Sequence, residues 1–352
     1  MKNLIAIVSF VCLGIIASIY VGFGQLTPAA VDSNDRELDG LNEKYVLDFT
    51  HIVAENTPKG RAAVRFAQKV EEKTDGWVEV NVHPNGLRYE AQEEFDALQN
   101  NQVDFIAPAF SEIAVRDESW MIMDLPYAFT DYDEVSKAYE GKIGEKLFES
   151  IEARGYKPLD FWDNGFKQLT NDVHPIEDPQ DMSNLSFRVM PSEVLNDTMN
   201  QLGAAPENAP FNEVYSMLNE GIVDGTENTL SNIYSKGFYT EQKYLTKSNH
   251  NYLGYAVLMN PTTWRTLPSD YQSSIQEAMD ETTEWLEGYA QTMNEEMSTR
   301  VTNASIKVTR LTDSDIEKWR QELQPVYNRY RNEIGHELMF ELEKMHEDEL
   351  GY

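Results

Sequence analysis

The chain has 352 residues, of which 60 are acidic and 29 basic, and its formal net charge at pH 7 is −31. This length is enough for two domains of ordinary size, each with its own core. So acidic a chain is unsuited to nucleic acid or to anionic lipid surfaces, both of which attract positive charge. An anionic ligand would also be repelled by the global charge, so local cationic groups would have to hold it.

The first 44 residues lack the alternating strand and helix pattern of the rest of the chain. Residues 3–24 carry no charge and follow Lys2, which is typical of an export signal, although an apolar length of about 20 residues also suits a membrane-spanning anchor. We expect residues 1–24 to be one of these two, and the protein to be periplasmic or otherwise extracytoplasmic. Residues 25–44 are polar without a sustained period and are predicted to be a linker. Cys12 is the only cysteine and lies inside the apolar segment, so the exported body cannot form a disulfide.

From Tyr45 onward, short apolar strands alternate with amphipathic helices. The first round is predicted as strand 45–53 (YVLDFTHIV), helix 59–73, strand 77–83 (WVEVNVH), helix 89–99 and strand 103–109 (VDFIAPA). A second round of strands is predicted at 157–165 (KPLDFWDNG), 186–190 (SFRVM) and 221–227 (GIVDGTE). This βαβ rhythm predicts an α/β sheet.

A long helix follows the second round of strands. Its core-facing side chains recur at intervals of three or four residues; they are Ile275, Met279, Thr282, Leu286, Tyr289, Met293, Met297 and Val301. A helix of about 30 residues spans roughly 40 Å, enough to cross two domains. A coiled coil is less favoured because the stretch lacks a strict heptad. Residues 315–350 also have a helical pattern and are predicted to be a packed outer layer.

Two segments carry the chemistry of a carboxylate site. They are LSFRVMPS, which contains Arg188, and PFNEVYSMLNEGIVDGTENTL at residues 210–230, which contains Asn228. A planar guanidinium donates two parallel hydrogen bonds to a carboxylate, and an amide beside it can donate to one of the oxygens. Chemistry alone leaves open that Arg188 is a solvated or salt-bridged residue.

These segments resemble the signature of the solute-binding proteins of tripartite ATP-independent periplasmic (TRAP) transporters, the DctP-type family, in which lxxRvxxS and evYxaLqxGxvDGxEN recur. The resemblance covers nearly the whole chain after residue 44. Further segments resemble the family in the expected order: VLDFTHIVAENTPKGRAAVRFAQKVEEKTDGWVEVNVHPNGL, DALQNNQVDFIAPAF, MDLPYAFTD, NGFKQLTN, YTEQKYLTKSNHNY and WRTLPSDYQ.

The resemblance implies a two-lobed, periplasmic-binding-protein-like α/β fold. In this fold a cleft lies between the lobes and a long helix spans both. On this basis we expect lobe I to comprise residues 45–165 and 254–293, and lobe II to comprise residues 166–253 and 294–352.

The resemblance also implies roles for the polar residues of these motifs. Arg188 would anchor a ligand carboxylate, and Asn228 would assist it. Lys167 stands where many relatives have a second arginine. A lysine offers positive charge but lacks the planar guanidinium of arginine, so whether Lys167 contacts the ligand is left open. Glu227 either braces its loop or touches the ligand.

Four further residues are predicted to contribute to the site. Phe211 resembles a position that packs on the apolar side of the ligand, with a plain core role as the alternative. Tyr89 and Phe110 follow the second and third strands, at loops that face the cleft in this family. Glu112 lies near them and could accept hydrogen bonds from a hydroxyl or an ammonium group. The ligand stays open among C4-dicarboxylates, 2-oxo or hydroxy acids, sugar acids, aromatic acids and ectoine-like zwitterions.

The function implied is that of a monomeric receptor that captures a small organic acid by lobe closure and delivers it to a TRAP membrane permease. The alternatives are a ligand-sensing module for a membrane kinase, and an exported hydrolase or lyase that uses paired carboxylates. We expect no catalytic residue, cofactor, metal or nucleic-acid partner, because no HExxH, GxSxG, phosphate-loop, GxGxxG or calcium-loop pattern occurs.

Overall fold

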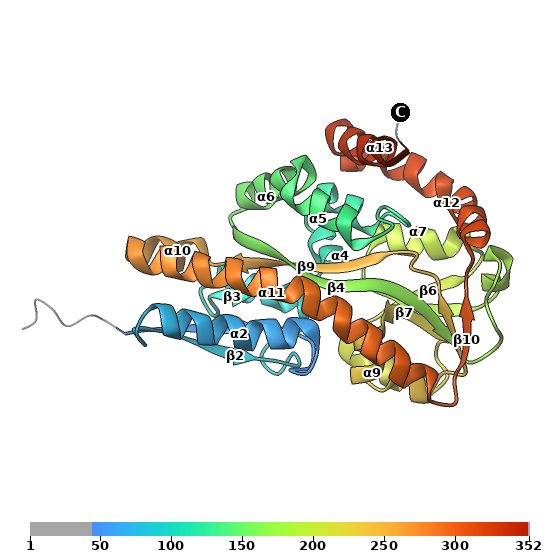
Figure 1. Cartoon of the computed structure of the whole chain (residues 1–352), viewed down its shortest axis with the longest axis horizontal. Helices are drawn as coiled ribbons and strands as arrows, with labels where there is room; N and C mark the ends of the chain where they lie inside the picture. Colours follow the sequence, from blue (N-terminus) through green and yellow to red (C-terminus); the bar gives the residue numbers. More distant parts are fainter. Residues whose placement is uncertain (1–43, 351–352) are drawn as a thin grey trace, which may run out of the picture. The chain divides into compact units, whose positions relative to one another are not determined.

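The computed structural model describes residues 44–350, with side chains to residue 346 (Figure 1). By its contacts the chain divides between Glu43 and Lys44. The predicted export signal or anchor at 1–24, and the predicted linker at 25–44 apart from Lys44, lie outside the described residues. Within residues 44–350, no helix combines the length and apolar character needed to cross a bilayer.

Strands and helices alternate through most of this region. The strands are β1 Tyr45–Thr50, β2 Val78–His83, β3 Phe105–Ile106, β4 Lys157–Asn171, β5 Ser186–Val189, β6 Ala205–Asn208, β7 Gly225–Thr229, β8 Tyr244–Lys247, β9 Tyr252–Met259 and β10 Lys307–Arg310. The α-helices are α2 Pro58–Lys73, α3 Ala91–Gln99, α4 Phe110–Ala114, α5 Tyr132–Glu140, α6 Lys142–Ala153, α7 Glu193–Gln201, α8 Val214–Asn219, α9 Leu230–Ser235, α10 Pro261–Thr266, α11 Ser269–Thr302, α12 Asp313–Ile334 and α13 His336–Leu350. Short 3-10 helices are η1 Glu118–Asp124, η2 Pro179–Met182, η3 Phe211–Glu213 and η4 Phe238–Thr240.

The strands of the described region form a mixed sheet in the order β2-β1-β3-β9-β4-β7-β5-β6, and β8 pairs with both β4 and β10. Strand β4 runs through both halves of this sheet. The first half also contains β1, β2, β3 and β9, and the second half also contains β5, β6, β7, β8 and β10. Residues 157–166 of β4 pair antiparallel with β9, whereas its residues 167–171 pair antiparallel with β7. We propose that the two halves are the two lobes, because the partner of β4 changes beside the predicted boundary at residues 165 and 166.

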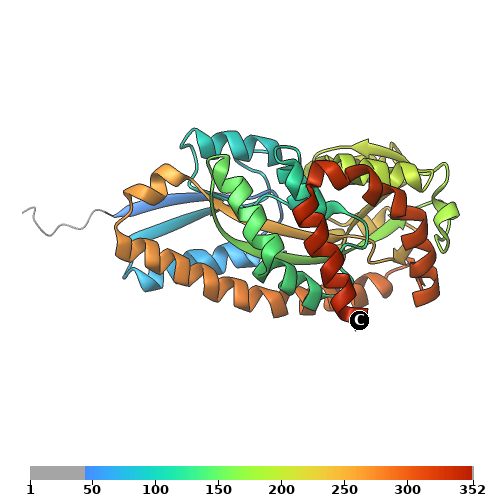
Figure 2. The same cartoon turned by 90° about the horizontal axis from the view of Figure 1, so that it is seen from above.

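The long helix α11 lies across both halves. It packs on α2 and β4 of the first half and on α9 of the second (Figures 1 and 2). Its buried side chains are Ile275, Ala278, Met279, Thr282, Leu286, Ala290, Asn294, Met297 and Val301. Asn294 is a polar exception: its Nδ2 donates to the Asn164 carbonyl at 2.6 Å, and its Oδ1 accepts from the Ser231 amide at 2.9 Å. Helix α11 therefore has hydrogen bonds to both halves.

The C-terminal segment forms two helices rather than one continuous run. Gly335 separates α12 from α13 with φ = 99°, a conformation that glycine adopts without steric cost. Helix α12 packs on α7, and α13 packs on α6 (Figure 1). The segment thus contacts both halves of the molecule, whereas the predicted division assigned it to lobe II alone.

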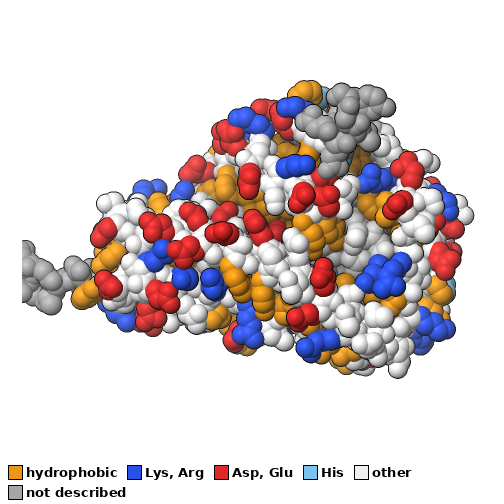
Figure 3. Space-filling model, in the orientation of Figure 1, with side chains coloured by type: hydrophobic (Ala, Val, Ile, Leu, Met, Phe, Trp, Pro, Cys, Tyr) orange, Lys and Arg blue, Asp and Glu red, His pale blue; other side chains and the backbone are white. Residues whose placement is uncertain are grey.

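The acidic charge is spread over the surface. On the face that α2 and α11 form, acidic side chains lie with basic ones among them (Figure 3). Lys73 of α2 pairs with Glu281 of α11 at 2.7 Å, and Lys69 pairs with the same glutamate at 3.4 Å. Water and salt screen such surface pairs, so they contribute little to stability.

Candidate functional site

A cavity of about 240 Å³ lies between residues of the two halves of the sheet. The first half supplies residues from the start of α3 and from α4, and the second half supplies residues at the ends of β5 and β6 and just after them. The lining residues are Glu90, Ala91, Gln92, Glu93, Glu112, Arg188, Pro191, Asn208, Ala209, Pro210 and Phe211. Three of the predicted ligand residues, Glu112, Arg188 and Phe211, therefore lie in one cavity.

Arg188 lies on β5, between β6 and β7, and is 1% exposed. Its Nε and Nη2 donate to the Ala209 carbonyl at 2.9 and 2.6 Å, and its Nη1 has no hydrogen-bond partner in the described part of the chain. Burial lowers the pKa of Arg188 to about 10, so the guanidinium keeps its charge at neutral pH. A buried charged donor without a partner is costly, and a ligand carboxylate in the cavity would satisfy it.

Lys167 and Glu227 form a buried ion pair between the adjacent strands β4 and β7. The Lys167 Nζ lies 3.0 Å from Glu227 Oε2, and the two side chains are 1% and 0% exposed. Burial raises the pKa of Glu227, and the charge of Lys167 opposes that rise. His250 Nε2 is 3.8 Å from the same oxygen, but burial, together with the charge of Lys167, lowers the pKa of His250 to about 3. Glu227 thus holds Lys167 in place, and a direct contact of Lys167 with the ligand stays a prediction.

Asn228 follows Glu227 on β7, and β7 pairs with β5, which carries Arg188. The Asn228 Oδ1 accepts from the Thr229 amide at 3.0 Å and from Asn232 Nδ2 at 2.9 Å. Its acceptor atom is therefore occupied by the protein, which leaves the Nδ2 group as the donor suited to a carboxylate.

Besides Arg188, two of the predicted ligand residues line the cavity: the acid Glu112 and the aromatic Phe211. The Glu112 Oε2 accepts from the Ala109 amide at 3.1 Å, which caps α4, and burial raises the pKa of Glu112. The Phe211 ring contacts Phe238 edge to face at a centroid separation of 5.9 Å. Phe211 both lines the cavity and packs in the core, so its contact with a ligand stays a prediction.

Tyr89 and Phe110 are not among the residues that line this cavity. Phe110 is 1% exposed and packs against Trp120, Tyr139 and Phe161 at centroid separations of 5.7–6.0 Å. Tyr89 precedes the lining residue Glu90 and packs partly buried against the core. The structure therefore places Phe110 in the core of the first half and Tyr89 at the edge of the cavity.

Sequence reasoning did not single out three buried ionisable residues of the first half: His51, Lys59 and Glu94, which are 0–1% exposed. Lys59 lies in the first turn of α2, after Thr57, whose hydroxyl caps the helix by accepting from the Gly60 amide. Positive charge there opposes the helix dipole, and this was the signal available in the sequence. Among residues 44–350, no group of three or more His, Cys, Asp or Glu side chains is arranged to hold a metal ion.

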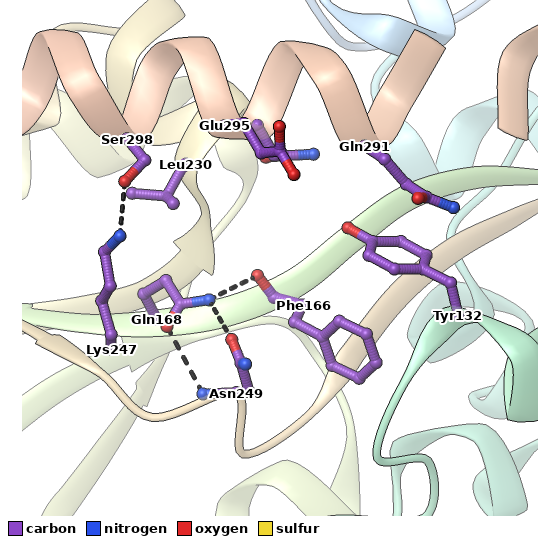
Figure 4. A pocket seen from close by; sticks show the side chains of 10 residues that line it. Tyr132, Phe166, Gln168, Leu230, Lys247, Asn249, Gln291, Glu295 and Ser298 are labelled. Atoms are coloured by element: carbon purple, nitrogen blue, oxygen red, sulfur yellow. Dashed lines mark hydrogen bonds between the residues drawn. The ribbon is translucent and has the colours of Figure 1, made fainter. Parts of the chain in front are cut away.

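A second cavity of about 360 Å³ lies beneath α11 (Figure 4). Phe166 and Gln168 of β4 line it, whereas Lys167 between them does not. Two pairs of its polar side chains are hydrogen-bonded to each other: Lys247 donates to Ser298, and Gln168 donates to Asn249 (Figure 4). None of its described lining side chains has a buried polar atom without a partner. We therefore propose that the ligand site is the smaller cavity at Arg188.

Residues 49–333 match the DctP family, whose members are bacterial extracellular solute-binding proteins of family 7. The chain belongs to this family. It is 42% identical over 349 residues to the C4-dicarboxylate-binding protein DctB of Bacillus subtilis strain 168, an alignment that covers 99% of this chain and 100% of that protein. It is 38% identical over 318 residues to the C4-dicarboxylate-binding periplasmic protein DctP of Rhodobacter capsulatus, covering 89% of this chain and 95% of the relative.

Solved structures of family members have the same fold. A TRAP periplasmic solute-binding protein from Sulfurospirillum deleyianum, solved with bound succinate, is 37% identical with a TM-score of 0.82, and the match covers 86% of this chain and 99% of that one. A TRAP protein from Pseudomonas aeruginosa PAO1, with bound L-malate, is 29% identical with a TM-score of 0.79, covering 81% and 100%. The predicted family, fold and long helix are confirmed. The chain is a TRAP-type solute receptor rather than an exported hydrolase or lyase.

Proposed function

We propose that this DctP-family receptor binds a C4-dicarboxylate, such as succinate or L-malate, outside the cytoplasm and delivers it as a monomer to a TRAP membrane permease. The observation that carries the proposal is the buried Arg188, which lines the cavity and whose Nη1 has no hydrogen-bond partner among the described residues. The names of the relatives at 42% and 38% identity support the choice of C4-dicarboxylates among organic acids.

Binding would be coupled to lobe closure because both halves of the sheet line the cavity. A ligand that contacts Arg188 from one half and lining residues such as Gln92 from the other stabilises the closed arrangement over an open one. Micromolar affinity corresponds to about −8 kcal/mol, which a guanidinium-carboxylate pair in a dry cavity plus a few hydrogen bonds can supply.

A thermal-shift experiment tests the proposal. Purified protein is heated with succinate, L-malate, galactonate or a neutral sugar; a ligand at roughly 100 times its dissociation constant adds about 2.7 kcal/mol of stability. We expect succinate and L-malate to raise the melting temperature, and Arg188→Ala to abolish that response. Arg329→Ala is the matched control, because Arg329 is a half-exposed arginine that pairs with Asp197 on the surface. A response to galactonate alone would overturn the ligand class, and a full response in Arg188→Ala would overturn the anchor.

Delivery is tested separately by uptake into proteoliposomes that contain the two TRAP permease subunits. Labelled succinate should enter only when this receptor is added on the outside. Tight binding of succinate without receptor-dependent uptake would favour the alternative of a sensing module for a membrane kinase.

A further inference from the structure

The cavity beneath α11 is separate from the cavity at Arg188, since the two share no lining residue. Its volume of about 360 Å³ is enough for a small molecule. Phe166 and Gln168 line it, and Lys167 between them on β4 points to the other face of the strand, because side chains alternate along a strand. A molecule in this cavity would therefore not compete with a ligand at Arg188.

Lys247 gives one end of this cavity a positive charge. It lies on β8, is partly buried, and donates from its Nζ to the Ser298 hydroxyl on α11. It has no ion pair with a carboxylate in the described part of the chain. Burial, together with the charge of Arg310, lowers the pKa of Lys247, as expected for an ammonium without a paired anion. A ligand carboxylate would supply that anion, and the Ser298 hydroxyl could donate to it as well.

Aromatic rings and a carboxylate form the other end. The rings of Tyr132 and Phe166 lie together on the side of the cavity away from Lys247 (Figure 4), with their centroids 5.2 Å apart and their planes at 79°. Glu295 extends from α11 above them, and burial together with the negative charges of Asp163 and Glu295 raises the pKa of Tyr132. Aromatic rings attract a quaternary ammonium group, and a nearby carboxylate adds to that attraction.

We propose that this cavity is a second ligand site and binds a small betaine-type zwitterion. The carboxylate of the ligand pairs with Lys247, and its quaternary ammonium lies against Tyr132 and Phe166, beside Glu295. A ligand with a single charge would satisfy only one end of the cavity, and Glu295 would repel a dicarboxylate. This inference goes beyond the proposed function, because the ligand belongs to a different chemical class and does not contact Arg188.

Isothermal titration calorimetry with glycine betaine tests the proposal, on protein saturated with succinate and on protein without it. The parent should bind glycine betaine in both cases, and so should Arg188→Ala. Lys247→Met removes the partner of the carboxylate and should weaken the binding about tenfold or more. Glu295→Gln should weaken it about threefold or more, a smaller effect because Glu295 is exposed to solvent.

Lys243→Met is the matched control. Lys243 lies four residues before Lys247, is exposed, pairs with Asp172 and does not line the cavity, so its loss should leave glycine betaine binding unchanged. Choline and acetate each carry one of the two charges, and each should bind at least about tenfold more weakly than glycine betaine. Circular dichroism checks the fold of each variant. If Lys247→Met does not fold, Glu295→Gln carries the test, because its side chain lies on the exposed side of α11.

Four results would overturn the second site. The first is a parent protein that does not bind glycine betaine. The second is glycine betaine that succinate displaces, or that Arg188→Ala no longer binds, because it would then occupy the cavity at Arg188. The third is binding as tight in Lys247→Met and Glu295→Gln as in the parent, and the fourth is choline or acetate that binds as tightly as glycine betaine. Glycine betaine binding to protein without succinate is measured independently of the proposed function, so the failure of one is distinguishable from the failure of the other.

Discussion

The buried pair of Lys167 and Glu227 makes the protein sensitive to the loss of one charge. In Lys167→Met, the Glu227 carboxylate, which is 0% exposed, would lose the ammonium 3.0 Å away. His250 cannot replace it, because burial keeps the pKa of His250 near 3 and the ring neutral. Removing one partner of a buried pair costs about 3–5 kcal/mol. We expect the free energy of unfolding of Lys167→Met to fall by about that amount at pH 7.

Urea unfolding followed by tryptophan fluorescence measures this loss, since the chain has 6 tryptophans. The double variant Lys167→Met/Glu227→Gln should recover most of the stability, because it leaves no unpaired charge. In the single variant, the folded state would hold a proton on Glu227 that the unfolded chain releases near pH 4.3, so its defect should grow as the pH rises above about 4.3. A single variant as stable as the parent, or a double variant no more stable than the single one, would refute this reasoning. The succinate affinity of the double variant then measures what Lys167 contributes to binding apart from stability.

Two further predictions concern buried polar groups outside the cavity. Asn294→Ala should lose about 1–3 kcal/mol of stability, because the Asn164 carbonyl and the Ser231 amide lose their partner; a melting temperature equal to that of the exposed control Asn303→Ala would contradict this. Burial raises the pKa of Asp163 from 3.8 to about 6, so the folded state holds a proton that the unfolded chain releases, and stability should fall by on the order of 3 kcal/mol between about pH 4 and pH 6 and then stay level. Asp163→Asn should remove this fall; melting temperatures from pH 4 to pH 8 that run parallel in both proteins would count against it.

The sequence determined the elements whose signals are local. The predicted helix 59–73 corresponds to α2, Pro58–Lys73, and the periodic residues from Ile275 to Val301 correspond to the long helix α11. Arg188 was also identifiable, because its motif fixes both its residue type and its place on a strand. In these cases the information lies within a few residues along the chain, and local spacing decides which face of a helix or strand is buried.

Only the tertiary structure decided which polar side chains are buried and with what partners. Asn294 interrupts the apolar face of α11 because it bonds to Asn164, 130 residues away in sequence. Lys59 bonds to the Ala107 carbonyl 48 residues away, and Lys167 pairs with Glu227 across a separation of 60 residues. The surroundings of Phe110 could not be predicted from the sequence either, because its position after a strand does not determine whether the ring enters the core or the cavity. The charge and hydrogen bonding of a buried group depend on which strands lie side by side, and that arrangement forms only when distant segments of the chain pack together.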